Sequence, residues 1–331
     1  MRLIAALVLL SLPILGSALE VQPKPANVDA TITRGLGFLA KDAMTWKAEH
    51  NCVTCHHTAL VVWSMREAKL RGHAVDEPVL AEMTKWVSDS AYGTATSDVE
   101  RTPEGTPKFL TPGPAWFALG LDADPKPDAA AQRELKLFYK TIEDCQTETG
   151  AWLSLPKTRP PFFGESDDST TSLATLALLP AAASGDAEAI KARDKGVKWL
   201  AETKTDDDPQ SVAFRLILWK RLNRPVEEWM PLAQRIKERQ NEDGGWSQAT
   251  DMASDAWATG EALYALAHAG VKSTEPAIAR AQAFLTKTQR EDGSWPMTSR
   301  PRDHLGIRAK NLVPIIGAGS AWAVLGLVRS R

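Results

Sequence analysis

The residues best suited to chemistry in this chain are the cysteines and histidines of the stretch Cys52-Val-Thr-Cys55-His56-His57. The spacing Cys-x-x-Cys-His is the attachment signature of a c-type haem. In such a site both thiols form thioether bonds to the haem vinyl groups, and the histidine is the proximal ligand of the iron. We therefore expect Cys52 and Cys55 to hold haem c and His56 to bind its iron. Because positions i, i+3 and i+4 of a helix share one face, a helix through this stretch would turn all three residues towards one macrocycle.

Two other interpretations of the same side chains remain open. Cysteine and histidine are also zinc ligands, but the motif lacks the second Cys/His pair of a usual structural zinc site. Cys52 and Cys55 are alternatively a redox-active dithiol or disulfide, although no thioredoxin-like βαβ pattern surrounds them. We favour haem c over both.

A haem iron bound by His56 has a sixth coordination position to fill. His57 is adjacent in the sequence and cannot reach the opposite face of the same haem. Methionine in this position raises the reduction potential, a second histidine lowers it, and an empty position permits ligand binding. We favour His304, because its long loop can fold inward. The full set of candidates is Met252, Met297 and His304, with His50 just upstream of the motif.

The N-terminus has the features of a secretory signal peptide. A basic start, Met1-Arg2, is followed by the apolar run Leu3 to Leu15 and by small residues at Gly16-Ser-Ala18. The run is short for a membrane span, so an uncleaved anchor is the lesser alternative. We expect cleavage after residue 18 and a periplasmic or secreted chain, 19–331, without a further apolar segment of spanning length. Haem c is attached outside the cytoplasm in bacteria, so this agrees with the motif.

Composition narrows the possible partners. The chain has 39 Lys and Arg against 41 Asp and Glu, a net charge of −2, which gives no sign of a nucleic-acid or anionic-membrane partner. Three cysteines do not indicate a disulfide framework, and a chain of this length can bury a core without one. Twelve Trp against three Tyr indicate a repeated packing motif. The partner that remains is an unidentified redox protein.

The tryptophans define a repeat. Gln240-Asn-Glu-Asp-Gly-Gly-Trp246 and Gln289-Arg-Glu-Asp-Gly-Ser-Trp295 are copies of one unit, and Gln146-Thr-Glu-Thr-Gly-Ala-Trp152 is a weaker copy. Each follows an amphipathic helical pattern and precedes one that is richer in Ala, Leu and small residues. A second pattern, Ser-Asp followed by apolar residues, recurs at Ser166 to Leu178 and Ser254 to Ala267.

Extending this pairing predicts an all-α fold, an (α/α)6 toroid of six outer and six inner helices. The outer patterns carry charges on one face, whereas the inner ones are apolar over most of their circumference, as enclosed helices require. The long loops gather at one rim, where the Cys52–His57 stretch lies and where function is expected. Outer helices are predicted near 28–42, 77–91, 127–144, 186–203, 226–240 and 275–289, and inner helices near 54–71, 112–121, 167–183, 209–222, 254–269 and 314–329.

The Gln-x-x-Asp-Gly-Gly/Ser-Trp units resemble the QW repeats of the squalene–hopene cyclase and prenyltransferase superfamily. The matching residues are Gln240, Gly245 and Trp246, then Gln289, Gly293 and Trp295. The resemblance implies a single toroid domain in residues 19–331, in which the Gln and Trp side chains brace the barrel. The chain is identified as a member that carries a Cys-x-x-Cys-His motif in addition.

The same resemblance suggests catalytic residues. Class II cyclases protonate a double bond with the middle carboxylate of Asp-x-Asp-Asp, and the nearest stretch is Glu165-Ser-Asp167-Asp168. It implies Glu165, Asp167 and Asp168 as an acid cluster, with a small apolar ligand in the toroid cavity. Alternatively, Asp167 or Asp168 caps a helix, which the parallel Ser254-Asp255 favours. Known cyclases also pair two such domains, and only one fits here. Protein prenyltransferases hold zinc with Asp, Cys and His, which is a second route to a metal at Cys52 and Cys55.

Taken together, these patterns favour an exported monohaem c-type protein on a cyclase-like toroid, in electron transfer or redox sensing rather than catalysis. The alternatives are an isoprenoid cyclase or transferase, and a non-catalytic binding toroid with a Cys/His metal site.

Overall fold

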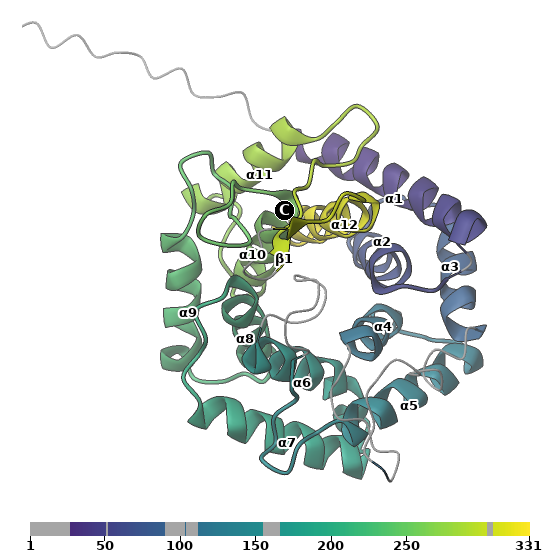
Figure 1. Ribbon diagram of the computed structural model, residues 1–331, viewed down its shortest axis with the longest axis vertical. Coiled ribbons are helices and arrows are strands. Elements are labelled where there is room, and N and C mark those ends of the chain that lie inside the picture. The colour runs from purple at the N-terminus through teal and green to yellow at the C-terminus, as the bar shows by residue number, and fades with distance from the viewer. Residues whose placement is uncertain (1–26, 51, 90–102, 104–111, 155–165, 303–306) are drawn as a thin grey trace, which may run out of the picture.

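Two concentric rings of helices make up the molecule (Figure 1). The computed structural model describes residues 27–50, 52–89, 103, 112–154, 166–302 and 307–331. The outer helices are α1 (Val28–His50), α3 (Glu77–Asp89), α5 (Ala129–Asp144), α7 (Ala187–Glu202), α9 (Val226–Glu238) and α11 (Pro276–Thr288). The inner helices are α2 (Leu60–Leu70), which continues the π-helical turn η1 (Cys55–Ala59), then α4 (Pro112–Asp122), α6 (Asp167–Ala183), α8 (Pro209–Arg221), α10 (Ala256–His268) and α12 (Val313–Ser330). The predicted all-α toroid is confirmed.

Two details differ from the predicted elements. Helix α1 ends at His50 rather than near residue 42, because Ala43 is fully buried and continues the apolar face of the helix. In the loop before α12, the two-residue strands β1 (Pro301–Arg302) and β2 (Ile307–Arg308) pair in antiparallel register. The signal peptide, residues 1–18, lies outside the described residues. The longer α1 matters for function, since its last turns reach the Cys-x-x-Cys-His stretch.

The motif tryptophans and glutamines tie the outer ring together. Each indole Nε1 donates to the backbone carbonyl ten residues earlier: Trp152 to Ile142 (2.6 Å), Trp246 to Ile236 (2.7 Å) and Trp295 to Leu285 (2.7 Å). Each glutamine Nε2 donates to a carbonyl of the next outer helix: Gln146 to Ala192 (2.8 Å), Gln240 to Ala277 (2.8 Å) and Gln289 to Thr31 (3.0 Å). The last bond joins α11 to α1 and closes the ring. The bracing role predicted for these side chains is confirmed.

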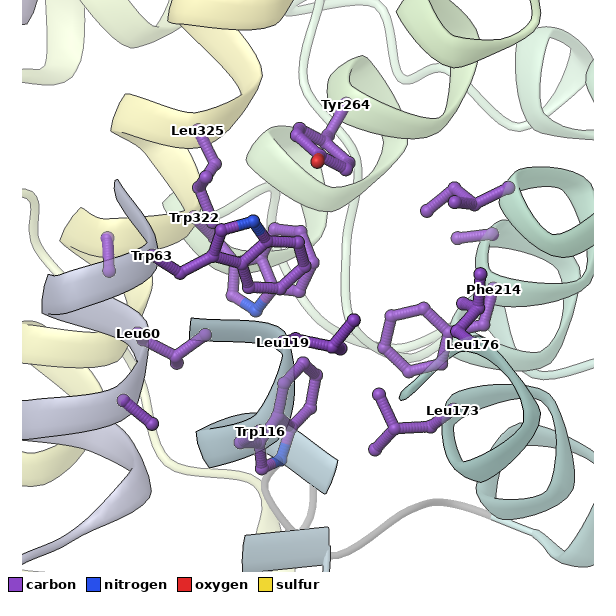
Figure 2. Close-up of a cluster of buried hydrophobic side chains, with 14 of the residues drawn as sticks. Leu60, Trp63, Trp116, Leu119, Leu173, Leu176, Phe214, Tyr264, Trp322 and Leu325 are labelled. Atoms are coloured by element: carbon purple, nitrogen blue, oxygen red, sulfur yellow. The ribbon is translucent and has the colours of Figure 1, made fainter. Parts of the chain in front are cut away.

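Aromatic side chains fill the centre of the inner ring (Figure 2). Trp322 of α12 makes ring contacts at 5.6 to 6.2 Å with Trp63, Trp116, Phe214 and Tyr264, which come from four other inner helices. All five residues are at least nine-tenths buried. A cavity of only about 20 Å³ remains beside Trp63, Phe214 and Tyr264. This cavity is far smaller than an isoprenoid chain.

Helix α12 is largely buried. Residues Val313–Ser330 are long and apolar enough to cross a membrane by length and composition, so the expectation that no further apolar segment of spanning length follows the N-terminus was wrong. In the toroid, 72% of this stretch is buried. Helix α10 approaches it so closely that a Cβ on Gly260 would lie 2.2 Å from the carbonyl oxygen of Trp322. Its apolar composition therefore suits an inner helix of the ring.

Candidate functional site

The Cys-x-x-Cys-His stretch joins α1 to the first inner helix. Residues 52–54 have no regular secondary structure, and η1 begins at Cys55. Thr54 is extended (φ −137°, ψ 156°), and its Oγ1 accepts a bond from the backbone N–H of His57 at 3.2 Å. This cap starts the helix after Thr54. The prediction that Cys52, Cys55 and His56 share one helical face was therefore wrong for Cys52, which precedes the helix.

The two motif cysteines are unbridged and differ in exposure. Cys52 is exposed, while Cys55 and His56 are half-buried, and Cys55 packs against the core. The cysteines form no disulfide, and burial raises the pKa of the Cys55 thiol to about 12. Reactive dithiols have thiols of lowered pKa, so this environment disfavours the thioredoxin-like alternative.

Among the described residues, no three His, Cys, Asp or Glu side chains gather closely enough to hold a metal ion. A structural zinc site needs four such ligands, and a catalytic one needs three. A c-type haem takes one protein imidazole on its proximal side and two thioether bonds, which is the donor set that Cys52, Cys55 and His56 provide. The donor set therefore fits haem better than zinc.

The last turns of α1 hold this stretch in place. The indole Nε1 of Trp46 donates to the carbonyl oxygen of Cys52 at 2.9 Å. One ring contact of Trp46 is with His57, at 4.3 Å between centroids and 4° between planes, and another is with His50, at 3.7 Å and 6°. His50 is therefore engaged in stacking on α1. Trp46 links Cys52 and the buried His57 to one helix.

Behind the motif, His57 is fully buried. Its Nε2 lies 3.0 Å from Oδ2 of Asp42, and its Nδ1 contacts Nδ1 of His56. The backbone of α12 comes close at this point, since a Cβ on Gly317 would lie 2.9 Å from Nε2 of His57 and 3.1 Å from Oδ2 of Asp42. His57 thus connects a carboxylate to the expected iron ligand.

The sixth-ligand candidates are scattered. His304 lies outside the described residues. Met297 is 6% exposed and packs against Gly319 of α12, so its side chain is part of the core. Met252 is half-buried in the loop before α10, where its N–H bonds to the carbonyl of Ala249. Helix α12 lies between α10 and η1 in the ring. Both methionines stay predictions as iron ligands.

The aspartates of the acid cluster that the cyclase resemblance implies lie at the start of α6 and bond to neighbouring segments. Asp167 accepts bonds from the backbone N–H and the hydroxyl of Ser154, at 2.7 and 3.0 Å. Asp168 is 1% exposed and pairs with Arg215 of α8 at 2.9 Å. Burial raises the pKa of Asp168, and the Arg215 charge opposes that rise. Glu165 lies outside the described residues. The two aspartates thus have separate structural partners.

Asp255 occupies the position in its own repeat that Asp167 occupies in the earlier one. The motif tryptophans donate their backbone N–H to equivalent threonines, Trp152 to Thr171 and Trp246 to Thr259, both at 2.9 Å. This alignment puts Asp255 at the place of Asp167. Asp255 caps α10 by accepting from the N–H of Ala258 at 3.0 Å, and burial raises its pKa to about 6. Asp255 therefore caps its helix, whereas α6 is capped by Ser166, so the alternative that Asp167 or Asp168 caps α6 was wrong.

A separate cavity of about 450 Å³ lies between α8, α9 and α10. Its size suits a small ligand, and several polar groups of its lining are bonded within the protein. Gln248 donates to Asp255 at 2.7 Å and accepts from Arg300 at 3.0 Å, and Asp207 pairs with Arg239. These pairs make the lining part of the framework.

The prediction from sequence missed Asp42, Trp46 and Gly317. Asp42 and Trp46 are four residues apart and share a face of α1, but the expected end of α1 near residue 42 left Trp46 in a loop. No local pattern identifies Gly317 as the residue that lies against His57, because the contact joins segments far apart in the sequence.

Comparisons with known proteins agree with the observed architecture. The family described as "Squalene-hopene cyclase N-terminal domain" matches residues 189–289. Among solved structures, a variant of the type II terpene cyclase MstE from Scytonema, in complex with geranylgeranyl dihydroxybenzoate, is similar with a TM-score of 0.60 and 12% identity, over 92% of this chain and 98% of that one. Unsaturated glucuronyl hydrolase from Bacillus sp. GL1 gives a TM-score of 0.59 and 13% identity, over 91% and 96%.

A third similar structure is a protein from Actinoplanes, with a TM-score of 0.57 and 14% identity over 92% of this chain and 99% of that one. No curated protein matches the chain by sequence. The chain has the α/α toroid fold of the superfamily that includes the terpene cyclases. Because terpene cyclases and a glucuronyl hydrolase share that fold, the fold does not decide the chemistry.

Proposed function

We propose that this protein is an exported monohaem c-type protein, built on an α/α toroid, that works in electron transfer or redox sensing. The observation that carries the proposal is the Cys52-Val-Thr-Cys55-His56 stretch at the start of an inner helix, with Cys52 exposed, Cys55 half-buried and both thiols unbridged. Cys52 and Cys55 would hold the haem through thioethers, and His56 would bind its iron. When bound, a c-type haem supplies one-electron oxidation and reduction.

Residues around the motif fix the position of the segment that would hold the haem. Trp46 holds the carbonyl of Cys52, and Thr54 caps the turn that carries Cys55 and His56. The turn is a π-helix, a form that is frequent at functional sites. Export through the N-terminal signal, followed by attachment outside the cytoplasm, completes the proposal.

An isoprenoid cyclase or transferase has less support from the geometry. Such an enzyme needs an open apolar cavity and a carboxylic acid free to give a proton. The described barrel centre is filled by Trp63, Trp116 and Trp322. Asp168 is committed to Arg215. The proposed chemistry therefore lies at the rim, outside the aromatic centre.

The proposal is tested by expressing the full chain in a bacterial host that matures c-type haem. We expect a red protein whose pyridine haemochrome spectrum is typical of two thioether bonds. Cys52→Ala/Cys55→Ala should lose all covalent haem, whereas Cys145→Ala, at the buried third cysteine, should keep it. A colourless wild-type protein, or one that binds zinc in stoichiometric amount, would refute the proposal.

Export is measured separately. The mature protein should be recovered from the periplasm or medium with its N-terminus near residue 19. A protein retained in the cytoplasm at full length contradicts this part of the proposal.

A further inference from the structure

The rim opposite the Cys-x-x-Cys-His stretch gathers basic side chains where the inner helices end. A basic residue at a helix C-terminus is favourable, because it meets the negative end of the helix dipole. That accounts for each residue singly, but it does not account for their grouping around one buried ring and one cavity. The four residues, at the ends of α2, α8, α10 and α12, are Arg71, Arg221, His268 and Arg329.

A small cavity lies between these helix ends. It holds about 20 Å³, which is room for one water molecule or one ion of similar size. Figure 2 shows Trp63, Phe214 and Tyr264 around this part of the interior. The polar side chains of the described lining are those of Arg221, His268, Tyr264 and Trp63, and the other walls are apolar side chains of α4, α6 and α8. The cavity therefore has a lining without a carboxylate among the residues that the structure describes.

His268 brings a buried donor to this cavity. Its Nδ1 lies 3.3 Å from Nη2 of Arg329. A guanidinium has no acceptor, so Nδ1 of His268 accepts and Nε2 carries the hydrogen. Burial, together with the charges of three arginines led by Arg329, lowers the pKa of His268 to about 3, which keeps the ring neutral at pH 7. Within the described residues, the buried Nε2 has no hydrogen-bond partner, and such an orphaned donor is rare enough to indicate a bound water or ion.

The charges around the cavity are unequal. Oε1 of Glu67 accepts from Nε of Arg71 at 3.1 Å and from Nη1 of Arg329 at 2.8 Å, so one carboxylate serves two guanidinium groups. Asp122 accepts from a tyrosine hydroxyl, and burial raises its pKa to about 6 although the Arg221 charge opposes that rise. Arg221 itself forms no ion pair with a described residue. The positive charge that lacks a paired carboxylate is therefore the one that lines the cavity.

We propose that this cavity binds one monovalent anion of halide size, such as chloride, between the Nε2–H of His268 and the guanidinium of Arg221. An anion only accepts, which suits a lining in which Tyr264 has the one polar side chain able to accept. A water molecule would satisfy the donor but would have to place its own two hydrogens as well. The volume excludes an oxyanion as large as sulfate or phosphate.

The helix ends themselves oppose an anion, since each carries a partial negative charge. That effect falls off within the last turn of a helix. The cavity is lined by Tyr264, one turn inside the end of α10, and by Phe214 and Ile217 of α8. The donors of His268 and Arg221 are closer to it, so the direct contacts decide the sign of the preferred charge.

The dependence of stability on chloride tests the site. Urea unfolding is measured in sodium gluconate and again as chloride replaces gluconate at constant ionic strength. An anion that binds only the folded protein lowers the unfolding equilibrium constant in a saturable way, so chloride at ten times its dissociation constant should lower it about tenfold. An unchanged constant, or a change that grows with chloride without a saturable component, overturns the site.

Two variants at the end of α8 separate the site from a general effect of charge. Arg221→Gln removes the guanidinium at the cavity and should abolish the response to chloride. Arg224→Gln removes the same charge three residues later. Arg224 pairs with Glu228 at 2.7 Å and does not line the cavity, so its variant should keep the response. Circular dichroism should show both variants folded, and an equal response in the two would overturn the role of Arg221.

The donor is observed directly by nitrogen-15 NMR of protein labelled at histidine. His268 should be protonated at Nε2, and chloride should shift that resonance with the same midpoint as it shifts stability. An Nδ1-protonated His268, or an Nε2 resonance that does not respond to chloride, refutes the site. The cavity lies at the opposite end of α2 from Cys52 and Cys55, so these results hold whether or not the chain carries haem.

Discussion

In four junctions between an outer and an inner helix, a tryptophan donates a hydrogen bond that fixes the loop. In the first of these junctions the tryptophan lies in the helix and the acceptor lies in the loop, which is the reverse of the other three. In the QW junctions, Trp152, Trp246 and Trp295 lie in the loop and donate back to the preceding outer helix. In the first junction, Trp46 lies in α1 and donates forward to the carbonyl of Cys52 in the loop. The loop then carries the Cys-x-x-Cys-His stretch instead of a tryptophan. The same kind of hydrogen bond thus fixes a loop in both cases, and in the first junction that loop carries the cysteines.

The QW junctions and the first junction differ in how deeply their tryptophans are buried. Trp295 is 0% exposed, and its bond is enclosed by outer and inner helices. Trp46 is half-buried, and Cys52 is exposed. The QW junctions therefore exclude water, whereas the first junction leaves Cys52 open to it. A site for covalent attachment needs that access.

The largest expected effect is on the stability of a QW junction. Trp295→Ala removes a fully buried indole and its hydrogen bond, so we expect a loss of about 3–5 kcal/mol in the free energy of unfolding. Trp46→Ala removes a half-buried ring and should cost about 1–2 kcal/mol. Urea unfolding of both variants measures the difference. Equal losses would show that the first junction is as structural as the others.

The capping carboxylate of Asp255, at a QW junction, should make the free energy of unfolding depend on pH. Burial raises the pKa of Asp255 from its ordinary value of 3.8 to about 6, so the folded state favours the protonated form. Its stabilising contribution is complete below about pH 4 and is lost as the pH rises through 6. Relative to Asp255→Asn, the wild-type protein should therefore lose about 2–3 kcal/mol between pH 4 and pH 7.

Urea unfolding at several pH values tests this, since the other carboxyl groups titrate alike in both proteins. A constant difference between the two proteins from pH 4 to pH 7 would mean that Asp255 is not the titrating group. In that case the acids at the helix mouths would again be open to a role other than capping.

The repeat was predictable because its parts are local. Each QW unit contains its glutamine, glycine and tryptophan within seven residues, so the sequence identifies the outer helix, the turn and the inner helix together. Gly244, for example, has φ +89°, and a Cβ there would lie 2.7 Å from the carbonyl of Arg280. The conformation requires glycine, and the motif has one. Both rings of helices followed from such units.

The surroundings of the Cys-x-x-Cys-His stretch were less predictable, because they depend on distant segments. His57 meets Asp42 of α1 and Gly317 of α12, and no spacing in the sequence relates these three residues. That His57 does not reach the far face of a haem bound by His56 stays a prediction. Sequence reasoning had no signal for the contact with Asp42, since α1 was expected to end there. The motif was visible, but its supporting residues were not.

The smallest expected effect on stability comes from replacing a tryptophan by phenylalanine, and it distinguishes the QW junctions from the first junction. Trp246→Phe removes a buried donor from the carbonyl of Ile236 and should cost about 1–3 kcal/mol. Trp46→Phe keeps an aromatic ring against His57 and frees only the carbonyl of the exposed Cys52, which water can reach. Its cost should be below about 1 kcal/mol.

The same change should still impair the proposed site, because Cys52 is no longer held at a fixed place relative to Cys55. Trp46→Phe should therefore lower the yield of protein with two thioether bonds. The yield is measured as the ratio of pyridine haemochrome absorbance to protein. Trp246→Phe should leave this ratio unchanged in the protein that folds. Equal ratios in the two variants would mean that the bond from Trp46 braces the fold in the same way as the bonds of the QW junctions. A lower ratio in Trp46→Phe alone, with stability retained, would separate the positioning of the thiols from the bracing of the ring.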